Sequence, residues 1–222
     1  PASLARKQPE TGKLMQLDFP KGNRFALRSA TLPCVLAPDG IAGSKNGLCS
    51  ADLVIGEGRI EAVLSAGTAP ADMESLDLQD RMVWPCFVDM HTHIDKGHIW
   101  ERQPNPTGDF EGALMAVRAD TKANWHAKDV ETRMDFSLRC AYAHGTSLLR
   151  THIDSLAPQH RISFEVFSDM RARWSDRIKL QAVALFPIDA IDDDAYFNDL
   201  VSVVAAHGAL LGGVTYPMPD LD

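Results

Sequence analysis

The sequence lacks several features that would assign it directly to a class of protein. It has no run of about 20 apolar residues, so no membrane span is predicted. Its net charge is −8, from 30 acidic and 22 basic residues, and no basic cluster occurs, which argues against a nucleic-acid-binding surface. The four cysteines (Cys34, Cys49, Cys86 and Cys140) form no C-x-x-C pair. Reduced thiols and a cytoplasmic location are therefore predicted.

The composition is that of a globular protein, with 45% hydrophobic and 23% charged residues. Residues 1–81 are expected to form a small β-rich domain, in which "ADLVIGEGRIEAV" (51–63) predicts a hairpin with its turn at 56–58. From residue 82 the pattern changes to long apolar runs that alternate with helical periodicity. Residues 82–222 are therefore expected to form a second domain.

Helices are predicted over 127–145, 160–174 and 192–208, because apolar residues recur there at helical spacing. Strands are predicted over 146–154, 178–187 and 209–217. Strands that alternate with helices in this way indicate βα units on a parallel sheet. His144 and His207 fall in the last turns of two of these helices, and we interpret them as helix-terminal residues. The predicted buried stripes are Val130, Met134, Leu138 and Tyr142; Ile162, Val166, Met170 and Trp174; and Phe197, Leu200, Val201 and Val204.

The segment "MVWPCFVDMHTHID" (82–95) is an apolar run that ends in polar residues. Side chains two apart on a strand point to the same face, so His91 and His93 project together. Two imidazoles at the end of an apolar strand can bind one divalent metal ion. The alternative is a pair of partly buried histidines that are satisfied by hydrogen bonds.

The tetrapeptide Thr-His-Ile-Asp occurs at 92–95 and again at 151–154, where Arg150 replaces the first histidine of the pair. A cation next to a metal ion is a poor ligand, so we do not expect His152 to bind the metal directly. His152 either lines the substrate pocket and supports the metal ligands, or packs in the interior while paired with Asp154 or Asp95.

The segments "DLVIGEGRIEAV" and "VWPCFVDMHTHID" resemble the start of the amidohydrolase superfamily. The segments "HTHIDKGHIWERQPNPTGDFEGAL", "HGTSLLRTHID" and "LQAVALFP" are similar to its cytosine deaminase branch, which is related to triazine-ring aminohydrolases. The pair Asp95-Lys96 is shared more with the triazine hydrolases. The resemblance implies an α/β fold, namely a (β/α)8 TIM-type barrel with a small N-terminal β-domain.

The resemblance also implies one divalent metal ion, zinc or iron, bound by His91 and His93. Only the first four βα units of a barrel of roughly 250 residues are expected within this sequence. The remaining ligands and the proton-transferring residues are expected beyond residue 222. The fourth strand, "ALLGGVTYP", has no lysine that could bridge two metal ions, which favours a single ion.

One position departs from the cytosine deaminase pattern. Ile188 follows Phe186-Pro187, where the pattern has a glutamine that hydrogen-bonds the amide edge of the pyrimidine. Isoleucine cannot donate or accept, and an unpaired buried amide edge costs on the order of 1–3 kcal/mol. This departure argues against cytosine itself. The candidates for substrate binding or for support of the ligands are His152, Asp154, Asp95, Gln103, Asp109 and Ile188.

The predicted function is hydrolytic deamination of an amino-substituted N-heterocycle, cytosine or a related pyrimidine or triazine, by a metal-activated hydroxide with release of ammonia. The alternative within the same fold is hydrolysis of a cyclic amide or an alkylamine substituent. The alternative from another class is a catalytically inactive homologue that acts as a scaffold. The expected partner is a small heterocyclic substrate, with no nucleic acid and no membrane, in a protein that could form homo-oligomers.

Overall fold

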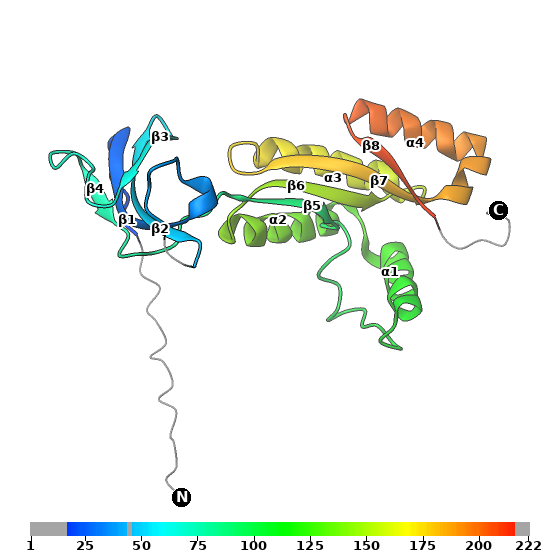
Figure 1. Ribbon diagram of the computed structural model, residues 1–222. Helices are drawn as coiled ribbons and strands as arrows, with labels where there is room; N and C mark the ends of the chain where they lie inside the picture. The colour runs from blue at the N-terminus through cyan, green and yellow to red at the C-terminus, as the bar shows by residue number, and fades with distance from the viewer. Residues whose placement is uncertain (1–16, 44–45, 216–222) are drawn as a thin grey trace, which may run out of the picture. The chain divides into compact units, whose positions relative to one another are not determined.

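The computed structural model describes residues 17–43 and 46–215. The chain forms two compact units, residues 1–85 and 86–222, which are described separately below. Figure 1 shows a small sheet in the first unit and a sheet with helices in the second. Over the described residues, no helix combines the length and the apolar character that crossing a membrane would require.

The first unit is a four-stranded sheet with the strand order β3-β2-β1-β4. Its strands are β1 (Arg24–Pro33), β2 (Leu48–Gly56), β3 (Arg59–Ser65) and β4 (Ser75–Asp77), and a short 3-10 helix, η1 (Cys34–Leu36), follows β1. Neighbouring strands β1, β2 and β3 are antiparallel, whereas β4 pairs with β1 in parallel. The predicted hairpin is confirmed, because β2 and β3 pair around a turn at Glu57 and Gly58, which both have positive φ.

The core of this unit contains one buried carboxylate, that of Asp52, among small apolar side chains. Its Oδ2 atom accepts hydrogen bonds from the backbone N–H groups of Gly67 and Ala69, each at 3.0 Å, and its Oδ1 accepts from that of Ser29 at 3.1 Å. A buried charge is tolerated only when it is hydrogen-bonded or paired. Asp52 therefore fastens the loop after β3 to the bend in β1.

The second unit is a parallel sheet with the strand order β5-β6-β7-β8. Its strands are β5 (Phe87–Thr92), β6 (Thr146–Asp154), β7 (Lys179–Pro187) and β8 (Leu210–Val214). Its helices are α1 (Phe110–Asn124), α2 (Ala127–Ala143), α3 (Gln159–Arg173), the 3-10 helix η2 (Ile188–Asp192) and α4 (Asp194–Ala206). The strands follow one another in sequence order, as successive βα units do.

The helices α2, α3 and α4 cover one face of this sheet. Leu149 and Ile153 of β6 are buried against them, together with Phe164 and Phe167 of α3. Residues of β6 that alternate with these, such as His152, point to the other face and are only half-buried. Arg150, His152 and Asp154 therefore lie on the face that the helices leave open.

The predicted helices and strands of the second unit are confirmed to within two residues at each end, apart from the end of the last strand. The end of the last strand, at 216–217, lies outside the described residues. His144 and His207 are the C-caps of α2 and α4, as predicted. Two members of the predicted stripes were wrong, because Tyr142 is 51% and Val201 is 37% exposed. Tyr142 lies one turn beyond the last fully buried residue of α2, where the helix extends past the core.

The sequence did not predict α1. Asp109 is its N-cap, with a side chain that accepts a hydrogen bond from Gly112 N–H at 2.8 Å. In Figure 1, α1 stands away from the strands of the sheet and does not lie along them. The helix forms part of the connection between β5 and α2.

Candidate metal centre and adjoining cavity

Three imidazoles lie together at the ends of β5 and β6. The ring centroids of His91 and His93 are 5.3 Å apart, and the rings meet edge to face. His152 stacks on His91 with a centroid distance of 4.0 Å and an interplanar angle of 25°. The alternation along β5 and the parallel pairing of Thr92 with Thr151 bring the three rings together.

The ring of His93 is oriented by the backbone of the neighbouring strand. Its Nδ1 atom lies 3.0 Å from the carbonyl oxygen of His152, to which a protonated Nδ1 donates. That tautomer leaves the lone pair on Nε2. Burial, and next the positive charge of Lys96, lower the pKa of His93. A neutral imidazole whose second nitrogen donates to a carbonyl is the usual form of a metal-binding histidine.

The residues present fit part of a metal site. His91 and His93 offer two imidazoles on one face of a strand end, and His93 already has the orientation that a ligand needs. Among the described residues, no group of three or more His, Cys, Asp or Glu side chains could hold a metal ion. His152 stacks face to face on His91, and stacked rings direct their lone pairs side by side, without converging. The pair would therefore supply two ligands of an incomplete set.

The carboxylates of the two Thr-His-Ile-Asp copies have different environments. Asp95 is fully buried, and its Oδ2 atom accepts a hydrogen bond from the backbone N–H of Asp154 at 2.9 Å. Burial, and next the charge of Asp154, raise the pKa of Asp95 to about 7. The Asp154 carboxylate accepts a hydrogen bond from Lys96 Nζ at 2.8 Å. The predicted alternative, in which His152 pairs with Asp154 or Asp95, is not formed: Asp154 accepts from Lys96, Asp95 accepts from the Asp154 backbone, and the buried Nδ1 of His152 has no hydrogen-bond partner.

A cavity of about 820 Å³ opens beside the Lys96–Asp154 pair. Leu114 and Val117 of α1 line one side, and Leu185 and Phe186 at the end of β7 line another. Apolar side chains make up most of the walls, and the polar lining includes the Lys96–Asp154 pair, which offers both a donor and an acceptor, and also Arg118 and Lys122 of α1. This is the usual composition of a small-molecule site, and its place at the carboxyl ends of parallel strands is the usual one for such sites.

The described residues that line this cavity do not include Gln103, Asp109 or Ile188. Gln103 lies in a turn where its backbone N–H donates to the carbonyl of Ile99 at 2.8 Å. Asp109 caps α1. The side chain of Ile188 packs over β8, where its Cδ1 would lie 2.7 Å from a Cβ on Gly213. The binding roles predicted for these three residues therefore stay predictions.

Lys96 and the α1 wall are the parts of this site that the sequence did not assign. The position of Lys96, directly after the H-x-H-x-D segment, was the one available signal for it.

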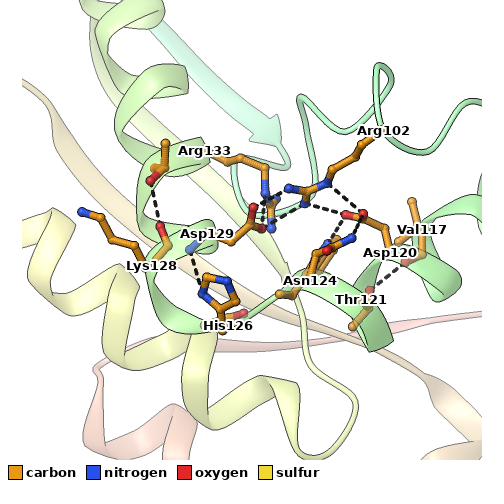
Figure 2. Close-up of polar contacts among 12 residues, drawn as sticks. Arg102, Val117, Asp120, Thr121, Asn124, His126, Lys128, Asp129 and Arg133 are labelled. Carbon is orange, nitrogen blue, oxygen red and sulfur yellow. Dashed lines mark hydrogen bonds and ion pairs between the residues drawn. The ribbon is translucent and has the colours of Figure 1, made fainter.

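The loop between β5 and α1 is bound by ion pairs both to α1 and to the next helix, α2 (Figure 2). Arg102 donates two hydrogen bonds to Asp120 of α1 and two to Asp129 of α2. These bonds, with that of Asp129 the strongest influence, raise the pKa of Arg102.

The parallel sheet with its crossover helices is the first four strands of a (β/α)8 barrel of the TIM type, joined in sequence to a small β-sheet unit. This is the fold of the solved 5-methylcytosine deaminase from Klebsiella pneumoniae, which superposes with a TM-score of 0.60 at 20% identity and covers 84% of this chain and 50% of that one. N-isopropylammelide isopropylaminohydrolase from Burkholderia multivorans gives a TM-score of 0.59 at 23% identity, over 86% of this chain and 45% of that one.

The sequence comparisons give the family. The model of the amidohydrolase family matches residues 74–155. The pterin deaminase of Rhizobium rhizogenes (strain K84 / ATCC BAA-868) is 61% identical over 203 residues, which is 91% of this chain and 46% of that protein. The resemblance to the amidohydrolase superfamily and its deaminase branch, which the sequence predicted, is therefore confirmed. The chain spans about half the length of these relatives.

Proposed function

We propose that the protein is a metal-dependent hydrolytic deaminase that acts on a pterin. The 61% identity to a pterin deaminase over nearly the whole chain is the observation that carries this proposal. In the reaction, water adds to the ring carbon that bears the exocyclic amine. The carbon–nitrogen bond then breaks, ammonia leaves, and the carbon becomes a carbonyl.

His91 and His93 would hold the metal ion, zinc or iron, as two of its ligands. When bound, such an ion supplies Lewis acidity that activates a water molecule near neutral pH. The carbonyl of His152 keeps His93 in the orientation of a ligand. Asp95 accepts a hydrogen bond from the backbone N–H of Asp154, and so holds in place a residue that lines the cavity.

The cavity is large enough for a bicyclic substrate such as a pterin. Its volume of about 820 Å³ lies in the range of sites for drug-sized ligands. The amide edge of a pterin presents one donor and one acceptor side by side. Lys96 would donate to the ring carbonyl and Asp154 would accept from the adjacent ring N–H. This pair would take over the recognition that Ile188 cannot provide.

Hydrolysis of an alkylamine substituent or of a cyclic amide remains the second candidate. It is supported by the Asp95-Lys96 pair, which resembles that of the triazine hydrolases. Both candidates place the reaction on a small heterocycle, and the absence of a basic cluster in the sequence fits that substrate. We also propose a cytoplasmic location, on the basis of the cysteine spacing.

The test uses the purified full-length protein, with ammonia release measured on pterin, cytosine, guanine and an N-alkylated aminotriazine. Deamination of pterin gives lumazine, which mass spectrometry distinguishes from the product of alkylamine loss. We expect turnover of pterin that a chelator removes and that added zinc or iron restores. Turnover that survives complete removal of the metal would overturn the metal-dependent mechanism. Failure to bind a metal ion or turn over any of these compounds would favour the inactive scaffold.

A further inference from the structure

The guanidinium of Arg102 joins two helices that have no strand between them. Its Nε and Nη2 atoms donate to the two carboxylate oxygens of Asp120 at 2.8 and 2.7 Å. Its Nη1 and Nη2 atoms donate to the two oxygens of Asp129 at 2.5 and 3.0 Å. Figure 2 shows the guanidinium lying between the carboxylate of α1 and that of α2. Only the planar fork of an arginine can satisfy both carboxylates in pairs.

The Asp120 carboxylate is fully buried and makes further bonds on its other side. Trp125 Nε1 and Asn124 Nδ2 each donate to it at 2.7 Å. The guanidinium of Arg133 lies over the Trp125 ring, 4.7 Å from its centroid, and its Nε donates to Asp129 at 2.8 Å. Two arginines and two aspartates thus balance in charge around one tryptophan. Removing one cation from such a group leaves a buried carboxylate without its partner.

This group of ion pairs involves the same helix, α1, that forms one wall of the cavity. Leu114, Val117 and Thr121 of α1 line the cavity, and so do Asn124 and Trp125, which both donate to the Asp120 carboxylate. The helix stands apart from the sheet (Figure 1). Its other attachments to the core are Trp125, just after its end, and Val117, which packs against the core. The position of the wall therefore depends on the Arg102 bridge.

We infer that Arg102 is a positioning residue, which sets the distance between the α1 wall and the Lys96–Asp154 pair across the cavity. The inference rests on the proposed function, because it assumes that this cavity receives the substrate. Arg102 does not line the cavity itself. It acts through Asp120, so its loss should affect how substrate is held more than the reaction of a substrate that is already in place.

The test compares Arg102→Ala and Arg102→Lys with the wild-type full-length protein, loaded with metal. Lysine keeps the charge and much of the length but cannot pair with both carboxylates. The matched control is Arg139→Ala, which breaks an exposed arginine–aspartate pair on α2. Two experiments are done: steady-state kinetics with pterin, which gives kcat and KM, and amide hydrogen exchange of α1 (110–124) against α3 (159–173) without substrate.

We expect Arg102→Ala to raise KM by roughly tenfold or more with a much smaller change in kcat, because a displaced wall weakens binding. The amides of α1 should exchange on the order of tenfold faster while those of α3 keep their wild-type protection. Arg102→Lys should show both effects, and Arg139→Ala neither. The inference is overturned if KM is unchanged in both Arg102 variants, or if exchange of α1 is unchanged in both. It is also overturned if exchange accelerates equally in α1 and α3. If the wild type does not turn over pterin, the proposed function fails, and the exchange measurement alone decides whether Arg102 fixes α1.

Discussion

His91 and His152 lie face to face at the ends of two neighbouring parallel strands, with ring centroids 4.0 Å apart. The two copies of Thr-His-Ile-Asp are thus brought side by side, yet they differ in role. The backbone of the second copy orients His93 of the first, while its own imidazole stacks on His91. The repeated segment corresponds to one candidate ligand pair and one supporting strand.

This arrangement predicts how histidine substitutions affect metal binding. His91→Ala and His93→Ala should each abolish stoichiometric binding of zinc or iron, because each removes one ligand. His152→Ala should retain the metal with a loss in affinity of at most roughly 10–100-fold, since the bond to His93 comes from a backbone carbonyl that the substitution keeps. Elemental analysis of the dialysed proteins checks this.

His144→Ala is the control for these three variants. His144 caps α2, where its Nδ1 lies 2.7 Å from the carbonyl of Cys140, far from the candidate site in sequence and in role. It should bind metal like the wild type. Full metal content in both His91→Ala and His93→Ala would contradict the assignment of the ligands.

The Lys96–Asp154 pair predicts a change in activity that is separate from stability. Lys96→Met should lower kcat/KM for pterin by roughly 10–100-fold, because the ring carbonyl would lose its donor. The pair is 23% and 27% exposed, so its loss should reduce the free energy of unfolding by only about 1 kcal/mol or less. Steady-state kinetics and urea unfolding measure the two effects.

Lys128→Met is the matched control, since Lys128 forms an exposed ion pair with Glu131 on α2. It should change neither activity nor stability measurably. If Lys96→Met had full activity on pterin, the proposed recognition of the amide edge would be wrong, although the proposed reaction would stand.

The βα units could be predicted because their apolar residues recur with helical spacing or form continuous strands. The helix α1 could not, for a physical reason. Its buried positions, at four-residue spacing, are Gly112, Ala116 and Asp120, none of which is a large apolar residue. The helix is held by ion pairs with Arg102, so its sequence lacks the hydrophobic periodicity that would predict it.

The candidate site could likewise be predicted only in part. The spacing of His91 and His93 places them on one face, and that placement follows from strand geometry alone. The cavity is different, because its walls come from α1, the end of β6, the start of α3 and the end of β7. Only the folded arrangement shows that Lys96 faces Asp154 there.

The core of the second unit predicts a large loss of stability on truncation of one side chain. Phe164 of α3 is fully buried and meets Phe167 edge to face, with centroids 6.5 Å apart. Phe164→Ala should reduce the free energy of unfolding by about 3–5 kcal/mol, through lost burial and the cavity that remains. Phe136→Ala is the control, because Phe136 is 52% exposed, and it should cost about 1 kcal/mol or less. Equal losses in chemical denaturation would contradict this core.

The buried carboxylate of Asp120 predicts a dependence of stability on pH. Burial alone would raise its pKa, but hydrogen bonds from Arg102, Trp125 and Asn124 outweigh burial and lower it. A carboxyl group whose pKa is lower in the folded than in the unfolded state stabilises the fold at pH values above its unfolded pKa of about 3.9. That contribution is lost as the pH falls through the folded value.

Asp120→Asn should therefore destabilise the protein by about 2–4 kcal/mol at pH 7, because Arg102 loses a charged partner in a buried group. The difference from the wild type should shrink as the pH falls below about 4, since the wild-type carboxylate is then being protonated. Urea unfolding at pH 7 and at pH 3 measures both. Asp176→Asn serves as the control, because Asp176 is 74% exposed and its only ion pair is with the adjacent Arg177 among the described residues. A difference between Asp120→Asn and the wild type that stayed constant over this range would mean that shape or hydrogen bonding, and not the charge of Asp120, holds α1 in place.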